Sequence, residues 1–150
     1  MSDGLSPTSY DSIPQNFGVG KRIMVIDEVA FNLSTIKKML ERFGFEVVTI
    51  ASPKDSLRYM DGQEVFNAVF CCLSMQQLDG ITLITLAKKL VEMRGGKLPP
   101  FVLMILPNEV SRSHEATLHG FSYVLNKPIE LDRLLECLLT IADMAKLESS

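Results

Sequence analysis

Short apolar runs alternate along the chain with segments in which apolar residues recur at helical spacing. The runs at residues 23–26, 65–73 and 101–106 are apolar almost throughout, without the polar alternation of a strand that has one exposed face. Two further short runs, at 47–51 and 123–126, complete a set of five predicted strands. Because such strands are buried on both faces, the pattern predicts a parallel sheet covered by helices.

The segments that follow these runs predict five helices. Apolar residues recur every three or four positions after Asn32, which is expected to cap the first helix, and Gly44 is expected to end it. Ser52 and Pro53 are typical of a helix start and open the second helix. The remaining helices are predicted at residues 80–93, 111–119 and 131–145.

Five strands alternating with five helices leave few layouts once the crossovers are right-handed. The prediction is an α/β fold with three layers, α/β/α. Its sheet is doubly wound, five-stranded and parallel, with the flavodoxin-like strand order 2-1-3-4-5. In this architecture a functional site lies beyond the carboxyl ends of the strands, so the residues directly after each strand are the candidates.

The amino-terminal segment differs from the rest of the chain. Residues 1–20 are rich in Ser, Gly and Pro and have no apolar period, which is typical of a flexible arm or linker. Residues 21–146 form the predicted domain, and residues 147–150 form a short tail.

Composition narrows the class of protein. The chain is 47% hydrophobic with a net charge of −3, which favours a folded core and offers no basic face for nucleic acid. No apolar stretch reaches the ~18 residues of a membrane span, and the start lacks the features of a signal peptide. The three cysteines lack metal-ligand spacing and fit a reducing compartment. We expect a cytoplasmic protein without a cofactor and without nucleic-acid or membrane contact.

Three short motifs fall at predicted strand ends. Asp27 and Glu28 follow the first strand, the sequence MQQLDG at 75–80 follows the third, and Lys127 and Pro128 follow the fifth. In this order and at these places, the motifs resemble the receiver domain of two-component response regulators, particularly those fused to hybrid histidine kinases. The resemblance covers nearly the whole predicted domain.

The resemblance implies the parts of a phosphorylation site. In active receivers, two acidic residues after the first strand hold Mg²⁺ together with an aspartate that ends the third strand. That aspartate accepts a phosphoryl group from a histidine kinase, while a Ser or Thr after the fourth strand and a Lys after the fifth contact the phosphoryl oxygens. Asp27 and Glu28 match the acidic pair, and Lys127 matches the lysine, with Pro128 after it.

Three other positions depart from that pattern. Counting three residues back from Met75, as the motif implies, places Cys72 at the position of the acceptor aspartate. Ile105, or Leu106 one residue later, falls at the hydroxyl position, and Val124 falls at the aromatic position of the fifth strand. The chain therefore resembles a degenerate receiver, or pseudo-receiver, that lacks the phosphoacceptor.

The loss of the acceptor changes what the remaining charges can do. A thiol is a poor ligand for Mg²⁺, which prefers oxygen, so no metal is expected. Asp27 and Glu28 form at most a weak Mg²⁺ site, or are solvated loop carboxylates. Lys127 is expected to form an ion pair with Asp27, and Cys72 is expected to be an inert thiol.

We therefore expect a phosphorylation-independent regulatory module, not an enzyme, that binds a histidine kinase or another signalling protein. A receiver that is phosphorylated at a non-standard site is one alternative. A flavodoxin-like FMN or redox protein is the other, although acidic residues stand where a phosphate loop is needed. A homodimer or partner contact is expected to include Cys137 or Met144 of the last helix, with Arg112 or His119 on its polar rim.

Overall fold

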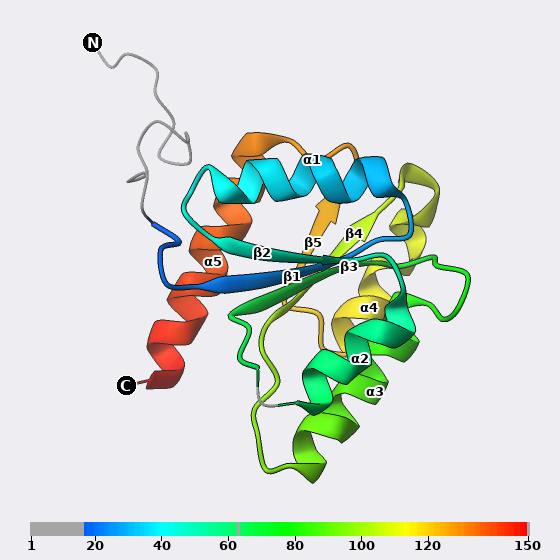
Figure 1. The fold of residues 1–150 in the computed structure, drawn as a ribbon. Helices are drawn as coiled ribbons and strands as arrows, with labels where there is room; N and C mark the ends of the chain where they lie inside the picture. The colour runs from blue at the N-terminus through cyan, green and yellow to red at the C-terminus, as the bar shows by residue number, and fades with distance from the viewer. Residues whose placement is uncertain (1–16, 63, 150) are drawn as a thin grey trace.

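The computed structural model describes residues 17–62 and 64–149, with side chains up to Asp143. A central sheet of five parallel strands carries helices on both faces (Figure 1). The strands lie in the order β2-β1-β3-β4-β5, which confirms the predicted doubly wound arrangement. They are β1 (Arg22–Ile26), β2 (Glu46–Ile50), β3 (Ala68–Cys72), β4 (Phe101–Ile105) and β5 (Tyr123–Asn126).

The helices divide between the two faces of the sheet. Apolar side chains of α1 and α5 pack on one face, and those of α2, α3 and α4 pack on the other. A 3₁₀ helix, η2, leads into α4. The helical elements are α1 (Ala30–Glu41), α2 (Pro53–Asp61), α3 (Gly80–Met93), η2 (Pro107–Arg112), α4 (Ser113–Leu118) and α5 (Leu131–Ser149).

The two central strands explain why the apolar runs lack alternation. Every residue of β3 and of β4 is buried, because both faces of the sheet are covered. Successive side chains of a strand point to opposite faces. Phe70 and Cys72 accordingly face α1 and α5, whereas Val69 and Cys71 face the helices on the other side.

The first helix starts earlier than predicted. It begins at Ala30, with Val29 at the capping position and no side-chain cap, so the prediction that Asn32 caps it is wrong. The side chain of Asp27 makes the turn instead, since its Oδ1 accepts the N–H of Val29 at 2.9 Å. The residue directly after β1 thus also directs the chain into α1.

The polar helix predicted at 111–119 is a different element. It begins at Pro107 as η2 and continues as the short α4. Proline at a first helical position fixes a suitable backbone angle and needs no N–H partner. The carboxylate of Glu109 accepts the N–H of Leu106 at 2.8 Å and completes the start of η2.

The described part of the predicted arm belongs to the domain. Phe17 packs edge-to-face on Phe45, with 5.9 Å between ring centroids, and the N–H of Gly18 donates to the carbonyl of Phe43. Phe17 and Gly18, which the prediction assigned to the arm, therefore pack against the domain, whereas Val19 and Gly20 are exposed. Residues 1–16 of the predicted arm lie outside the described residues.

The surface position predicted for Cys137 is also wrong. Its side chain has no exposed area and lies in the core with Leu134 and Ile141, which are one helical turn away on either side. The side chain of Met144 lies outside those described, whereas Arg112 is partly exposed and His119 is exposed. Within the part of the chain that the structure describes, no helix has the length and apolar character needed to cross a bilayer.

Candidate functional site

The carboxyl ends of β1, β3 and β5 bring the predicted site residues together. Asp27 directly follows β1, Cys72 ends β3, and Lys127 directly follows β5. The register between β1 and β3 pairs Ile26 with Cys71, so the next residue of each strand lies at the same edge. The N–H of Lys127 donates to the carbonyl of Ile105 at 2.8 Å, which extends the sheet by one step and fixes where the lysine side chain starts.

Asp27, Cys72 and Lys127 form a closed triad of side chains. The thiol of Cys72 donates to Oδ2 of Asp27 at 3.1 Å. Nζ of Lys127 donates to the same oxygen at 3.1 Å and to Sγ of Cys72 at 3.0 Å. Asp27 is 3% exposed and Cys72 is 4% exposed, so each group has its partner inside the protein.

The ion pair expected between Asp27 and Lys127 is present, and it is ionised. Burial by itself raises the pKa of Asp27, but the N–H of Val29, the Cys72 thiol and Lys127 together lower this pKa below its ordinary value of 3.8. Burial by itself lowers the pKa of Lys127, but contacts with Cys72 and Asp27 raise this pKa above its ordinary value of 10.5. At neutral pH the triad therefore holds one carboxylate and one ammonium.

The Cys72 thiol is protonated in this setting. Burial raises its pKa to about 12, and the hydrogen bond to Asp27 adds to this effect, although Lys127 opposes it. A nucleophilic cysteine needs the opposite, a pKa lowered toward neutrality. Cys72 therefore acts as a hydrogen-bond donor to Asp27 and not as a nucleophile.

We predict that the stabilising contribution of Asp27 to folding is lost in acid. Because its pKa is lower in the folded than in the unfolded state, its contribution is present above the ordinary value of 3.8 and is lost as pH falls through the folded-state pKa. Urea unfolding of wild type and Asp27→Asn between neutral and acid pH should show a stability difference that shrinks below about pH 4. Asp61→Asn, at an exposed position, is the matched control; a pH-independent difference for Asp27→Asn would contradict the assignment.

Glu28 does not join the triad. Its two carboxylate oxygens both lie 2.8 Å from the backbone nitrogen of Gln76 and accept its N–H. Gln76 lies in the loop between β3 and α3, residues 73–79, called the β3–α3 loop. Proline at position 76 would lack this donor. The acidic pair predicted from the sequence thus separates, one carboxylate binding a lysine and the other a backbone amide.

The donor set does not fit Mg²⁺. This cation requires near-octahedral coordination by oxygen atoms. The one carboxylate of the triad already accepts hydrogen bonds from a thiol and an ammonium. A positive charge 3.1 Å from Oδ2 of Asp27 repels a second cation. Among the residues described, His, Cys, Asp and Glu side chains form no group of three that could hold a metal ion.

The other predicted positions lie around the triad and offer no polar side chain to it. Ile105 is buried on the α2–α3–α4 face of the sheet, opposite to Cys72, and Leu106 is exposed beside it. Val124 is half-buried on the same face as Ile105. Pro128 is exposed and follows Lys127 through a cis peptide bond.

The Asp-Gly step of the MQQLDG motif has a packing role. Gly80 approaches the end of β3 so closely that an added Cβ would lie 2.5 Å from the carbonyl oxygen of Cys72. Asp79 caps α3 by accepting the N–H of Thr82 at 2.8 Å. The glycine therefore lets α3 start directly beside the triad residue, which fixes the path of the β3–α3 loop.

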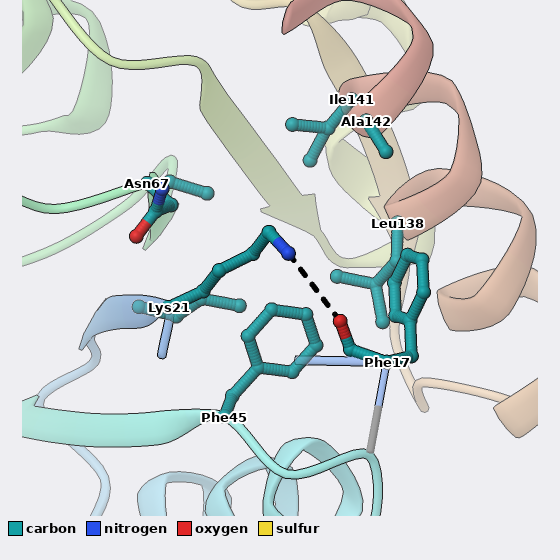
Figure 2. Close-up of a pocket in the computed structure, with 9 residues that line it drawn as sticks. Phe17, Lys21, Phe45, Asn67, Leu138, Ile141 and Ala142 are labelled. Atoms are coloured by element: carbon teal, nitrogen blue, oxygen red, sulfur yellow. Dashed lines mark hydrogen bonds between the residues drawn. The ribbon is translucent and has the colours of Figure 1, made fainter. Parts of the chain in front are cut away.

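A pocket lies at the amino end of the strands, opposite to the triad. Figure 2 shows Phe17, Phe45 and Leu138 around it, with Nζ of Lys21 donating to the carbonyl of Phe17 at 3.4 Å. Its lining is mostly apolar and includes no cluster of titratable groups. The triad is therefore the better candidate for the functional site.

Sequence reasoning missed Glu109, Ser74 and Gln77. Glu109 is buried and binds the β3–α3 loop, and Gln77 of that loop binds the start of α2. Glu109 stands three residues after Leu106, which is the spacing of a capping box, but Leu106 is not the Ser or Thr that marks such a box in a sequence. The contacts of Glu109 and Gln77 with residues of other loops cannot be predicted from spacing along the sequence.

Comparison with known proteins places this arrangement in a family. Residues 23–139 match the family model of the response regulator receiver domain. The chain is 30% identical over 118 residues to the two-component response regulator ARR11 of Arabidopsis thaliana, covering 77% of this chain and 21% of that protein. It is 28% identical over 116 residues to the transcriptional regulatory protein ZraR of Salmonella typhimurium, covering 77% of this chain and 25% of that protein.

Solved structures show the same fold. A response regulator receiver domain protein from Clostridium thermocellum superposes with a TM-score of 0.74 at 23% identity, covering 85% of this chain and 98% of that chain. A CheY-like receiver domain from Methylobacillus flagellatus superposes with a TM-score of 0.67 at 26% identity, covering 81% of this chain and 98% of that chain. The chain spans a quarter or less of the two curated relatives, which are longer proteins. With its fold, its strand-end motifs and this match in agreement, the chain belongs to the response regulator receiver domain family of two-component signalling.

Proposed function

We propose that this domain is a pseudo-receiver, which regulates a signalling partner by binding and without phosphorylation. The observation that carries the proposal is the position of Nζ of Lys127, which lies 3.0 Å from Cys72 and 3.1 Å from Asp27. An ammonium of the protein itself neutralises the remaining carboxylate. The site therefore holds a complete set of contacts without a cation or a phosphoryl group.

The chemistry of the triad argues against phosphoryl transfer. Transfer onto a receiver needs a carboxylate nucleophile that attacks in line with the leaving group, and a cation that neutralises the phosphoryl oxygens. Cys72 offers a protonated thiol with a pKa of about 12, and the carboxylate beside it, Asp27, is already paired with Lys127. Ile105 lies on the other face of the sheet and carries no hydroxyl.

The proposed partner is a histidine kinase, such as a hybrid kinase to which the domain is fused, or another protein of the same pathway. Receiver domains act by contact with such proteins, and the curated relatives carry further segments beyond the matched region. We further propose that the module is not an enzyme, needs no cofactor and acts in the cytoplasm. Its three cysteines are buried free thiols, as is usual in a reducing compartment.

We predict that the intact mass of the protein is unchanged after incubation with a small phosphodonor and Mg²⁺. A receiver domain with an acceptor aspartate, treated in the same reaction, is the positive control. Mass spectrometry that finds one added phosphoryl group per molecule, mapped by peptide analysis to the β3 segment, would contradict the proposal. It would favour a receiver with a non-standard acceptor.

A further inference from the structure

A single buried carboxylate joins the loops that follow β3 and β4. Glu109 of η2 is 8% exposed. Its Oε1 accepts the N–H of Leu106 at 2.8 Å, and its Oε2 accepts the hydroxyl of Ser74. The first bond is local to the start of η2, whereas the second reaches the β3–α3 loop, 35 residues earlier in the chain.

The segment that Glu109 holds has little apolar anchorage. In η2 only Glu109 is buried, and in α4 only Ala116 is buried. Val110 is 53% exposed and Leu118 is 74% exposed, so these apolar side chains do not fix the segment to the core. An element with so few buried contacts opens at low free-energy cost unless polar contacts hold it.

The other polar contacts from this segment reach the same part of the molecule. Arg112 lies 3.9 Å from the carboxylate of Asp79, in a pair that is largely solvent-exposed and contributes little. The carbonyl of His119 accepts from Nζ of Lys88 in α3. The segment of η2 and α4, residues 107–119 (the η2–α4 segment), is thus tied to the β3–α3 loop and to α3.

The β3–α3 loop is itself fixed from two other sides. Glu28 accepts the N–H of Gln76. Oε1 of Gln77 accepts the N–H of Lys54 at 3.1 Å and the hydroxyl of Ser52 at 2.9 Å, at the start of α2. The loop is therefore the fixed partner, and the η2–α4 segment is the element that can move.

We infer that Glu109 is a latch, which holds the η2–α4 segment against the β3–α3 loop through Ser74 and whose release frees that segment as a unit. The latch uses neither a metal ion nor a phosphoryl group, and none of its contacts involves the triad. It goes beyond the proposed function, because it would operate whether or not Cys72 can be modified. It sets the conformation in which a partner meets the exposed residues of the η2–α4 segment.

Hydrogen exchange of single and double variants tests the latch against a purely local cap. Ser74→Ala removes the bond between loops and leaves the bond to Leu106 in place. It should speed amide exchange in residues 107–119 about tenfold, the effect of losing one hydrogen bond to a charged group, while β1 and α1 keep wild-type rates. Glu109→Ala should speed the same residues at least as much, and the double variant should exchange no faster than Glu109→Ala alone.

Thr117→Ala is the matched control, because it removes a hydroxyl whose bond to Ser113 stays inside α4. It should not produce the tenfold faster exchange throughout residues 107–119 that is expected of Ser74→Ala. The latch is overturned if Ser74→Ala leaves residues 107–119 at wild-type rates, since Glu109 would then only cap η2. It is equally overturned if Ser74→Ala speeds exchange by the same factor throughout the sheet. These outcomes are independent of the phosphodonor experiment, so either proposal can fail alone.

Discussion

Replacing Lys127 with methionine should lower the free energy of unfolding at neutral pH by about 2–4 kcal/mol. The substitution keeps the length and apolar stem of the side chain but leaves the buried carboxylate of Asp27, whose side chain is 4% exposed, without a counter-charge. The loss stays below that of a fully buried pair because the side chain of Lys127 is 16% exposed. Urea unfolding followed by circular dichroism measures it.

The double variant Asp27→Asn/Lys127→Met separates this electrostatic effect from lost packing. Removing both charges should restore most of the lost stability, because replacing a buried pair costs far less than leaving one charge unpaired. Lys38→Met, at an exposed position of α1, should change stability by less than about 0.5 kcal/mol. A Lys127→Met protein as stable as wild type would show that the triad contributes nothing to folding.

Replacing Cys72 with aspartate should make the stability of the domain depend on Mg²⁺. The new carboxylate would stand beside Asp27, and the repulsion between them should destabilise the domain until a cation binds. At a Mg²⁺ concentration tenfold above its dissociation constant, binding should add about 1.4 kcal/mol and raise the melting temperature by several degrees. Wild type should show no such response.

Cys72→Asn is the control for this experiment, since it has a similar shape without the charge. Its melting temperature should not respond to Mg²⁺. Cation binding by Cys72→Asp should still not produce a phosphorylation response, because Ile105 is on the opposite face of the sheet. If the melting temperature of Cys72→Asp responds to Mg²⁺ no more than that of wild type, the absence of a carboxylate at position 72 is not what excludes the cation.

The fold was readable from the sequence because burial on both faces leaves a direct pattern. The strand at Tyr123–Asn126 and the helix at Gly80–Met93 have the predicted bounds, each set by an apolar run or by a glycine start. The Asp27–Lys127 pair was readable for a related reason, whereas Cys72 was placed beside it by the resemblance to the receiver motif. Parallel strands end at one edge, so Asp27 and Lys127 could be placed together from their positions in the chain.

The errors come from contacts that depend on three-dimensional placement. Cys137 lies near the edge of the apolar stripe of α5, and only the packing of that helix against the sheet decides that it is buried. Glu28 turns toward a backbone N–H of the β3–α3 loop, which carries no side-chain signature. Glu109 likewise binds a backbone N–H and a serine in a distant loop, so its role required the folded chain.

The most direct test of the closed triad is amide NMR of the wild-type protein, titrated with Mg²⁺ and then with a small phosphodonor. The account predicts that the amide signals of Lys127 in the triad, and of Val29 and Leu73 beside it in the chain, keep their positions through both additions. Progressive shifts of these signals with Mg²⁺, or a second set of signals in residues 107–119 after the phosphodonor, would contradict it.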